Sequence, residues 1–168
     1  HGIIRNTKKP WKYKINQLGY NYRLTDIQSA LGISQLKKLD VFIKRRNEIA
    51  KIYNNKLKNS DLFEIPKVQK NISHAYHLYP LKIRFDKLRI SKDMLLKKLR
   101  SKSINLQVHY IPIHHHKLYK SKINSYLPNT EIFFEQAISL PVYFSLKNNE
   151  ISYVLANLLK IVHSNIKK

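Results

Sequence analysis

The sequence predicts an α+β fold in which a long helix leads into a small antiparallel sheet covered by helices. Apolar residues recur every three or four positions over a long stretch that begins near residue 25, and again near the carboxy terminus. This spacing is typical of amphipathic helices. Between these stretches lie short segments in which apolar and polar residues alternate, as they do in half-buried strands. Short strands between helices favour a layered, mixed domain.

The first part of the chain contains the clearest helix start. Residues 1–16 mix lysines with aromatic side chains and are expected to form a loop that packs on the rest of the protein. Thr25-Asp26-Ile27-Gln28 then fits the capping-box pattern, in which the Thr and Gln side chains bond to exposed amides of the first turn. Beyond it the apolar spacing continues to Leu57, with a break expected at Gly32 and a restart at Ser34.

The rest of the chain is predicted to alternate short strands with helices. Period-two patterns predict three strands, at residues 81–85, 106–110 and 138–142. Capping residues and apolar spacing predict three helices, which begin near Ser91, Asn129 and Glu150. The expected sheet is therefore small and antiparallel, with helices covering it.

Composition limits the classes of function. The 168 residues include no cysteine, which excludes disulfides and is compatible with a cytoplasmic protein. No apolar run is long enough to span a bilayer, so no membrane partner is expected. The net charge of +22 raises nucleic acid as a partner. The lysines are scattered over nearly every predicted element rather than gathered on one face. The chain is also rich in Ile, Asn and Tyr, which like Lys have A/T-rich codons, so a compositional drift explains the charge at least as well. A basic nucleic-acid-binding module stays an alternative.

Several segments carry a resemblance to a known family. They are Leu18–Asp40, His1-Gly2-Ile3 with Arg5, Ala75–Pro80, Gln107–His114 and Ser139-Leu140-Pro141. In content and order these segments resemble the DegT-type nucleotide-sugar aminotransferases of fold type I, which depend on pyridoxal 5'-phosphate (PLP). Within that family the sequence is most similar to the UDP-4-amino-4,6-dideoxy-N-acetyl-beta-L-altrosamine transaminases of pseudaminic acid synthesis.

The resemblance implies a function for a longer protein. It implies transfer of an amino group, with glutamate as the expected donor, to a UDP-linked 4-keto-6-deoxy sugar by a homodimer with shared active sites. Another nucleotide-linked keto sugar is the alternative within the family. The family's cofactor-binding lysine precedes all the motifs present here, so we expect a carboxy-terminal part that holds no catalytic residue and is inactive alone. Its expected segments are the end of the large PLP domain with a cleft-lining loop (1–24), an interdomain helix region (25–58) and a small α+β domain (59–168).

The resemblance also assigns candidate roles to two residues ahead of the first helix. Asn21 matches an asparagine that reaches across the dimer interface to the phosphate of PLP, and its amide can donate hydrogen bonds to a phosphate oxygen. The simpler alternative is an Asn that makes a local turn bond. Arg23 could pair with a substrate diphosphate, or it could form a surface salt bridge with Asp26.

Three more residues are candidate substrate ligands. His109 and Tyr110 belong to a segment that resembles the family's substrate-facing strand end, where a His can bond sugar or phosphate oxygens. The alternative for His109 is a histidine satisfied within the core. His1 resembles the histidine of a motif near the family's cleft.

A metal site is not expected from the three adjacent histidines, His114-His115-His116. Adjacent side chains in regular structure cannot all face one ion, and no cysteine or cluster of carboxylates completes a ligand set.

Overall fold

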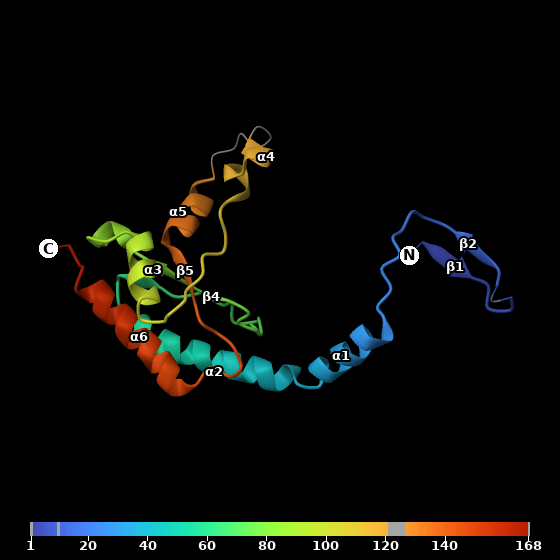
Figure 1. Ribbon diagram of the computed structural model, residues 1–168, viewed down its shortest axis with the longest axis horizontal. Coiled ribbons are helices and arrows are strands. Elements are labelled where there is room, and N and C mark those ends of the chain that lie inside the picture. Colours follow the sequence, from blue (N-terminus) through green and yellow to red (C-terminus); the bar gives the residue numbers. More distant parts are fainter. Residues whose placement is uncertain (1, 10, 121–126, 168) are drawn as a thin grey trace. The chain divides into compact units, whose positions relative to one another are not determined.

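The computed structural model describes residues 2–9, 11–120 and 127–167 (Figure 1). The chain divides into two compact units, His1–Leu39 and Asp40–Lys168. The expected α+β class is confirmed, because helices accompany two small antiparallel sheets. None of the described helices is long and apolar enough to cross a membrane. The division into three segments at residues 24 and 58 stays a prediction.

The amino-terminal unit opens with a hairpin where a loop was expected. Strands β1 (Ile3–Arg5) and β2 (Tyr13–Ile15) pair antiparallel. Gly2 has a φ of +67°, and a Cβ placed on it would lie 1.9 Å from the carbonyl oxygen of Gln17, so glycine is required at this close approach. The hairpin escaped prediction because strands of three residues are too short to show an alternating pattern.

Helix α1 (Asp26–Leu36) begins where the sequence predicted. The Thr25 hydroxyl accepts from the amide of Gln28 at 3.3 Å, and the Gln28 side-chain oxygen accepts from the amide of Thr25 at 2.9 Å. These two bonds confirm the capping box.

The break between the first two helices lies beyond the predicted position. α1 continues through Gly32, and the chain turns at residues 37–38 before α2 (Leu39–Leu57) begins. A Cβ at Gly32 would have no atom within 4 Å. The glycine is therefore an exposed helical residue that costs about 1 kcal/mol relative to alanine, which neighbouring helical residues can offset.

The amino-terminal unit exposes its apolar side chains. α1 buries none of its residues. The large apolar side chains exposed on and just before α1 are Leu18, Tyr20, Tyr22, Leu24, Ile27, Leu31, Ile33 and Leu36. Together they form what we call the apolar surface of the amino-terminal unit. Many exposed apolar side chains close together in the sequence are typical of a protein contact surface.

The carboxy-terminal unit is built on a three-stranded antiparallel sheet in the order β3–β4–β5. The central strand β4 (Tyr79–Ile83) lies between β3 (Phe63–Glu64) and β5 (Ala137–Leu140). All four residues of β5 are buried, so protein covers both faces of that strand. The first and third predicted strands are confirmed in position, with ends shifted by up to two residues.

The predicted strand at residues 106–110 is wrong. Within this stretch Gln107 forms an isolated bridge with Ser139, whose amide donates to the Gln107 carbonyl at 2.8 Å. Apolar and polar residues do alternate at 106–110, but on this edge of β5 only Gln107 pairs, whereas β4 pairs with all four β5 residues on the other edge. Phe85 also lies outside its predicted strand, in a 3-10 turn, η1 (Phe85–Lys87).

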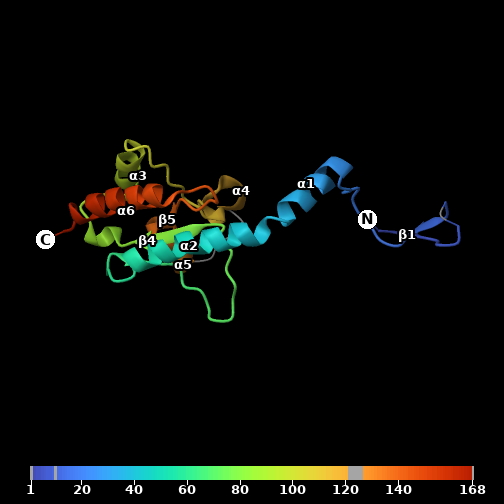
Figure 2. The same ribbon diagram turned by 90° about the horizontal axis from the view of Figure 1, so that it is seen from below.

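Helices surround the sheet of the carboxy-terminal unit. Besides α2, the helices of this unit are α3 (Lys92–Arg100), the single turn α4 (Lys117–Lys120), which lies away from the sheet, α5 (Pro128–Gln136) and α6 (Asn148–His163). α3 packs beside α6, and α5 lies against β4 (Figures 1 and 2).

The three predicted helix starts are confirmed to within two residues, but one predicted cap is wrong. Ser91 caps α3, because its hydroxyl accepts from the amide of Met94 at 3.2 Å. The last helix begins two residues before the predicted Glu150. Asn129 is not a cap: α5 begins at Pro128, whose fixed φ suits the first helical position.

One core joins α2, the sheet, α3 and α6. From α2 the buried residues are Ile49, Ala50, Tyr53 and Leu57. The predicted apolar stripe is thus buried in the second half of α2, whereas Leu36, the last residue of α1, and Leu39, the first residue of α2, are exposed.

Two tyrosines in this core are fully buried. Tyr53 donates its hydroxyl to the Pro141 carbonyl at 2.9 Å, and Tyr79 donates to the Asn54 side-chain oxygen at 2.6 Å. Their ring centroids are 5.0 Å apart. Burial raises the pKa of both hydroxyls above the usual value of about 10.

We therefore expect the carboxy-terminal unit to lose stability as the pH rises through about 10. Above that pH the unfolded chain releases the two phenolic protons while the folded chain retains them, so ionisation favours unfolding. The urea midpoint should fall between about pH 8 and about pH 10.5. It should fall less in a Tyr53→Phe/Tyr79→Phe variant, in which the lysines still titrate. Equal pH dependence in the two proteins would contradict this account.

Candidate functional site

Polar side chains from four segments of the carboxy-terminal unit line a cavity of about 360 Å³. The segments are α2, the chain just before β4, residues 105–110, and the end of β5 with the turn that follows. The polar lining includes Arg46, His77, Asn105, Gln107, His109 and Ser139. No acidic side chain is among the lining residues. The cavity is therefore suited to an uncharged or anionic ligand.

Arg46 on α2 holds two loops at this cavity. Its Nη1 donates to the carbonyl oxygens of Tyr76 at 3.0 Å, His77 at 3.2 Å and Val142 at 3.2 Å. These carbonyls lie in the segment before β4 and in the turn after β5. Within the described part of the chain the other guanidinium nitrogens of Arg46 make no hydrogen bond, so they remain available to a ligand.

Sequence reasoning missed Arg46, although a signal for it exists. The apolar stripe of α2 includes Ile43 and Ala50, and Arg46 stands between them at the same three-four spacing. A lone arginine on the buried face of a helix must satisfy its charge internally, because burying an unpaired charge is costly. Its position on the stripe, rather than its charge, distinguishes it from the exposed basic residues of this helix.

His109 lies at the cavity with one ring nitrogen engaged. Its Nδ1 is 2.8 Å from the hydroxyl oxygen of Ser139, which is buried on β5. In the described chain its Nε2 has no hydrogen-bond partner. Depending on the tautomer, Nε2 donates to a phosphate oxygen or accepts from a sugar hydroxyl. The two sequence interpretations are thus compatible, since the protein satisfies one nitrogen and leaves the other for a ligand.

Tyr110 follows His109 at the rim of the same cavity. The two rings meet edge to face with centroids 4.7 Å apart. The Tyr110 side chain is 74% exposed. Its apolar ring and hydroxyl are well placed to contact a ligand that enters from solvent, and this role stays a prediction.

Asn21 and Arg23 lie together in the amino-terminal unit, just before α1. Arg23 Nη1 donates to the side-chain oxygen of Asn21 at 2.5 Å. Among the described residues no ion pair joins Arg23 to Asp26, so the predicted surface salt bridge is not formed. Because the guanidinium occupies the oxygen of the Asn21 amide, the amide nitrogen with its two donors is left for another group.

The candidate residues thus form two groups. Asn21 and Arg23 belong to the amino-terminal unit, and His109 and Tyr110 belong to the carboxy-terminal unit. His1, the fifth candidate, lies outside the described residues. The structure adds Arg46 and Ser139 to the second group.

Comparisons with known proteins agree with these features. The family model described as the DegT/DnrJ/EryC1/StrS aminotransferase family matches residues 1–159. An uncharacterised protein of Methanocaldococcus jannaschii is 39% identical over 98% of this chain and 45% of its own length. The UDP-4-amino-4,6-dideoxy-N-acetyl-beta-L-altrosamine transaminase of Campylobacter jejuni is 33% identical over 100% of this chain and 44% of its own length.

A solved structure shows the same fold. Helicobacter pylori PseC, described as an aminotransferase involved in the biosynthesis of pseudoaminic acid, superposes with a TM-score of 0.83 at 31% identity, over 98% of this chain and 44% of that one. The chain therefore spans a little under half the length of the relatives it matches. Aminotransferases of this family are PLP-dependent. The match over residues 1–159 shows that the chain belongs to the DegT/DnrJ/EryC1/StrS aminotransferase family.

Proposed function

We propose that this chain is the carboxy-terminal part of a PLP-dependent aminotransferase that transfers an amino group from glutamate to a 4-keto-6-deoxy sugar carried on UDP. The proposal is carried by the similarity, over nearly the whole chain and in both sequence and fold, to altrosamine transaminases. Because the chain spans under half of those proteins, the activity belongs to the longer protein. In that protein PLP supplies the electron sink for the transfer.

The residues before α1 fit a role in holding the cofactor's phosphate. Arg23 orients the Asn21 amide by occupying its oxygen, which leaves two N–H donors on the nitrogen. Phosphate oxygens accept hydrogen bonds, and Arg23 adds positive charge beside them. Asn21 would thus bind the PLP phosphate of the neighbouring subunit, and Arg23 would orient Asn21 and attract the anionic groups.

The cavity of the carboxy-terminal unit fits part of the nucleotide sugar. Arg46 and His109 offer donors, and no lining side chain is acidic. A sugar diphosphate combines hydroxyls with negative charge, and both of these match that lining. His109 and Tyr110 would contact the sugar or its diphosphate, and the Ser139 hydroxyl would hold the His109 ring in position.

The apolar surface of the amino-terminal unit fits contact with the large domain or with a second subunit. α1 buries no residue of its own within this chain. A helix start that carries Asn21 and a wide apolar face is well suited to lie at a dimer interface, where burial of the face offsets the entropy lost on association. We therefore propose a homodimer with shared active sites.

The test is to read the coding sequence upstream of His1 and to express the protein that includes it. That protein should bind PLP through a lysine of its upstream part. With glutamate and a UDP-linked 4-keto-6-deoxy sugar it should form 2-oxoglutarate and the UDP-linked amino sugar, both detectable by mass spectrometry. Conversion of only a GDP-linked or dTDP-linked keto sugar would favour the alternative substrate. A PLP-loaded protein that converts none of these would contradict the proposal.

The substitution His109→Ala in that protein should raise KM for the nucleotide sugar about tenfold, because one hydrogen bond to a polar or charged group is lost. kcat should change less, since His109 is assigned to binding. Steady-state kinetics with the nucleotide sugar varied will measure both. His163→Ala, at the exposed end of α6, is the matched control and should leave KM unchanged. An unchanged KM in His109→Ala would remove His109 from the substrate site.

A further inference from the structure

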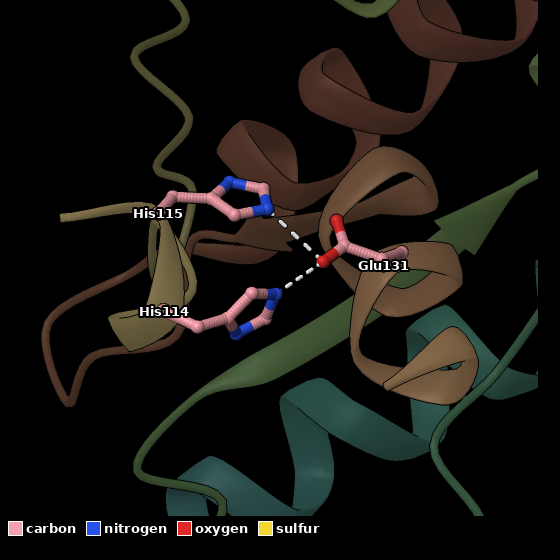
Figure 3. A group of neighbouring side chains, drawn as sticks. All are labelled: His114, His115 and Glu131. Carbon is pink, nitrogen blue, oxygen red and sulfur yellow. Dashed lines mark hydrogen bonds and ion pairs between the residues drawn. The ribbon is translucent and has the colours of Figure 1, made fainter. Parts of the chain in front are cut away.

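Two adjacent histidines and a carboxylate converge at a place that the proposed activity does not use. His114 and His115 lie in the 3-10 turn η2 (Ile113–His115), and Glu131 lies in the first turn of α5 (Figure 3). The Nε2 atoms of both imidazoles point at the same oxygen, Glu131 Oε1. His114 bonds to that oxygen directly, and His115 Nε2 lies 3.0 Å from it.

From the sequence no metal site is expected here, because adjacent histidines diverge in regular structure and no carboxylate is near them in the chain. The structure changes both conditions. In regular structure adjacent side chains diverge, but in the tight turn the rings of His114 and His115 meet edge to face with centroids 4.6 Å apart. The missing carboxylate comes from Glu131, which is distant in sequence and is brought in by α5. His116 takes no part in this group of three.

We propose that His114, His115 and Glu131 form a binding site for Zn²⁺ or a divalent transition metal of similar preference. The three ligand atoms all lie within 4.8 Å of one another. Around a tetrahedral zinc with metal–nitrogen distances of about 2.0–2.1 Å, neighbouring ligand atoms are separated by roughly 3.3 Å. Glu131 Oε1 lies 3.0 Å from His115 Nε2, which is close to that spacing, but it lies closer still to His114 Nε2. Rotation of the His114 and Glu131 side chains must therefore open that shorter contact before the ion can enter.

The donor set selects the kind of ion. Two imidazole nitrogens with one carboxylate oxygen suit zinc and its neighbours, whereas Mg²⁺ and Ca²⁺ prefer ligand sets made of oxygen. The chain's net charge of +22 opposes any cation at long range. That repulsion is screened over about 10 Å at 0.1 M salt, and bonds to nitrogen at short range outweigh it.

The surroundings indicate a site that is sheltered on one side and open on the other. The side chain of His114 is 15% exposed and that of His115 is 39% exposed. The ring of Phe134 packs edge-on against His115, with centroids 6.0 Å apart. Three protein ligands leave a fourth position for water, and His115 leaves that side accessible. A bound ion would tie the η2 turn to α5.

The experiment measures Zn²⁺ binding to the untagged, full-length protein by calorimetry and by metal analysis after gel filtration. One equivalent should bind in the micromolar range, and the midpoint of thermal unfolding should rise by a few degrees. Glu131→Gln, which keeps the side-chain shape, should weaken binding by at least tenfold, and His115→Ala should weaken it further. The adjacent His116→Ala variant is the matched control and should bind as the wild type does.

Cobalt provides a readout that does not depend on affinity alone. Co²⁺ at the site should give the visible absorption band of a tetrahedral ion with nitrogen ligands, and Glu131→Gln should abolish or shift it. Circular dichroism of each variant must match the wild type. If Glu131→Gln and His115→Ala bind Zn²⁺ as tightly as His116→Ala does, the three residues form a hydrogen-bonded cluster and the metal site is refuted.

Discussion

Replacing Arg46 with alanine is expected to lower the free energy of unfolding of the carboxy-terminal unit by about 2–4 kcal/mol, because three carbonyl oxygens lose one shared charged donor. Both loops that Arg46 joins border the ligand cavity. The loss should therefore appear as a lower urea midpoint, and in the full-length protein also as weaker binding of the nucleotide sugar.

A matched control separates this contact from the general effect of removing a charge. Lys44→Ala removes one positive charge from the same helix at an exposed position, and it should change stability by no more than about 0.5 kcal/mol. Arg46→Lys should recover only part of the loss, because an ammonium group cannot reproduce the reach of the guanidinium. If Arg46→Ala and Lys44→Ala unfold at the same urea concentration, the hydrogen bonds of Arg46 to the two loops do not stabilise the unit.

Asn21→Ala in the full-length protein is expected to weaken PLP retention roughly tenfold to hundredfold, because a hydrogen bond to a charged group contributes about 1.5–3 kcal/mol. PLP titration followed by absorbance will measure the change. Asn16→Ala, an exposed asparagine of the same unit, is the control and should retain PLP normally. Equal retention by the two variants would remove Asn21 from the cofactor site.

A mixed dimer tests whether Asn21 acts across the interface. One subunit carries Asn21→Ala, and the other lacks the cofactor-binding lysine of its large domain. If Asn21 serves the partner's site, both defects fall in the site that lacks the lysine, and the other site has its lysine and a donated asparagine. Assayed at a PLP concentration too low to load the Asn21→Ala homodimer, such heterodimers should regain activity that neither parent shows. Inactive heterodimers, with their formation shown independently, would place Asn21 in its own subunit's site.

The features that could be predicted from the sequence are those determined by bonds between residues close together in the chain. Thr25 and Ser91 were predicted as helix caps because each hydroxyl bonds to an amide only three residues later. A short stretch of sequence therefore contains both partners of the bond. The resemblance assigns site roles to Asn21 and His109 because both lie in recognisable motifs, and these roles stay predictions. It gave no account of what holds them, namely Arg23 for Asn21 and Ser139 for His109.

What escaped prediction depends on contacts between distant segments. Residues 106–110 alternate as a strand does, but whether they join a sheet depends on how the chain runs beside β5, which the local pattern does not contain. The role of Arg46 is evident only in the structure, where two loops supply the three carbonyl oxygens to which its side chain donates. Glu131 is recognised as a candidate metal ligand only in the structure, where α5 places it beside His114 and His115.

The pairing of β4 with β5 has a consequence for the order of folding. Tyr79 pairs with Leu140, so the strands close a long loop that contains α3, the η2 turn and α5. Closing such a loop costs chain entropy that local elements do not pay, which places this step late on the folding route. Ser139 reaches His109 only once β5 is in place. The cavity that contains His109 should therefore be completed late in folding, after the local helices have formed.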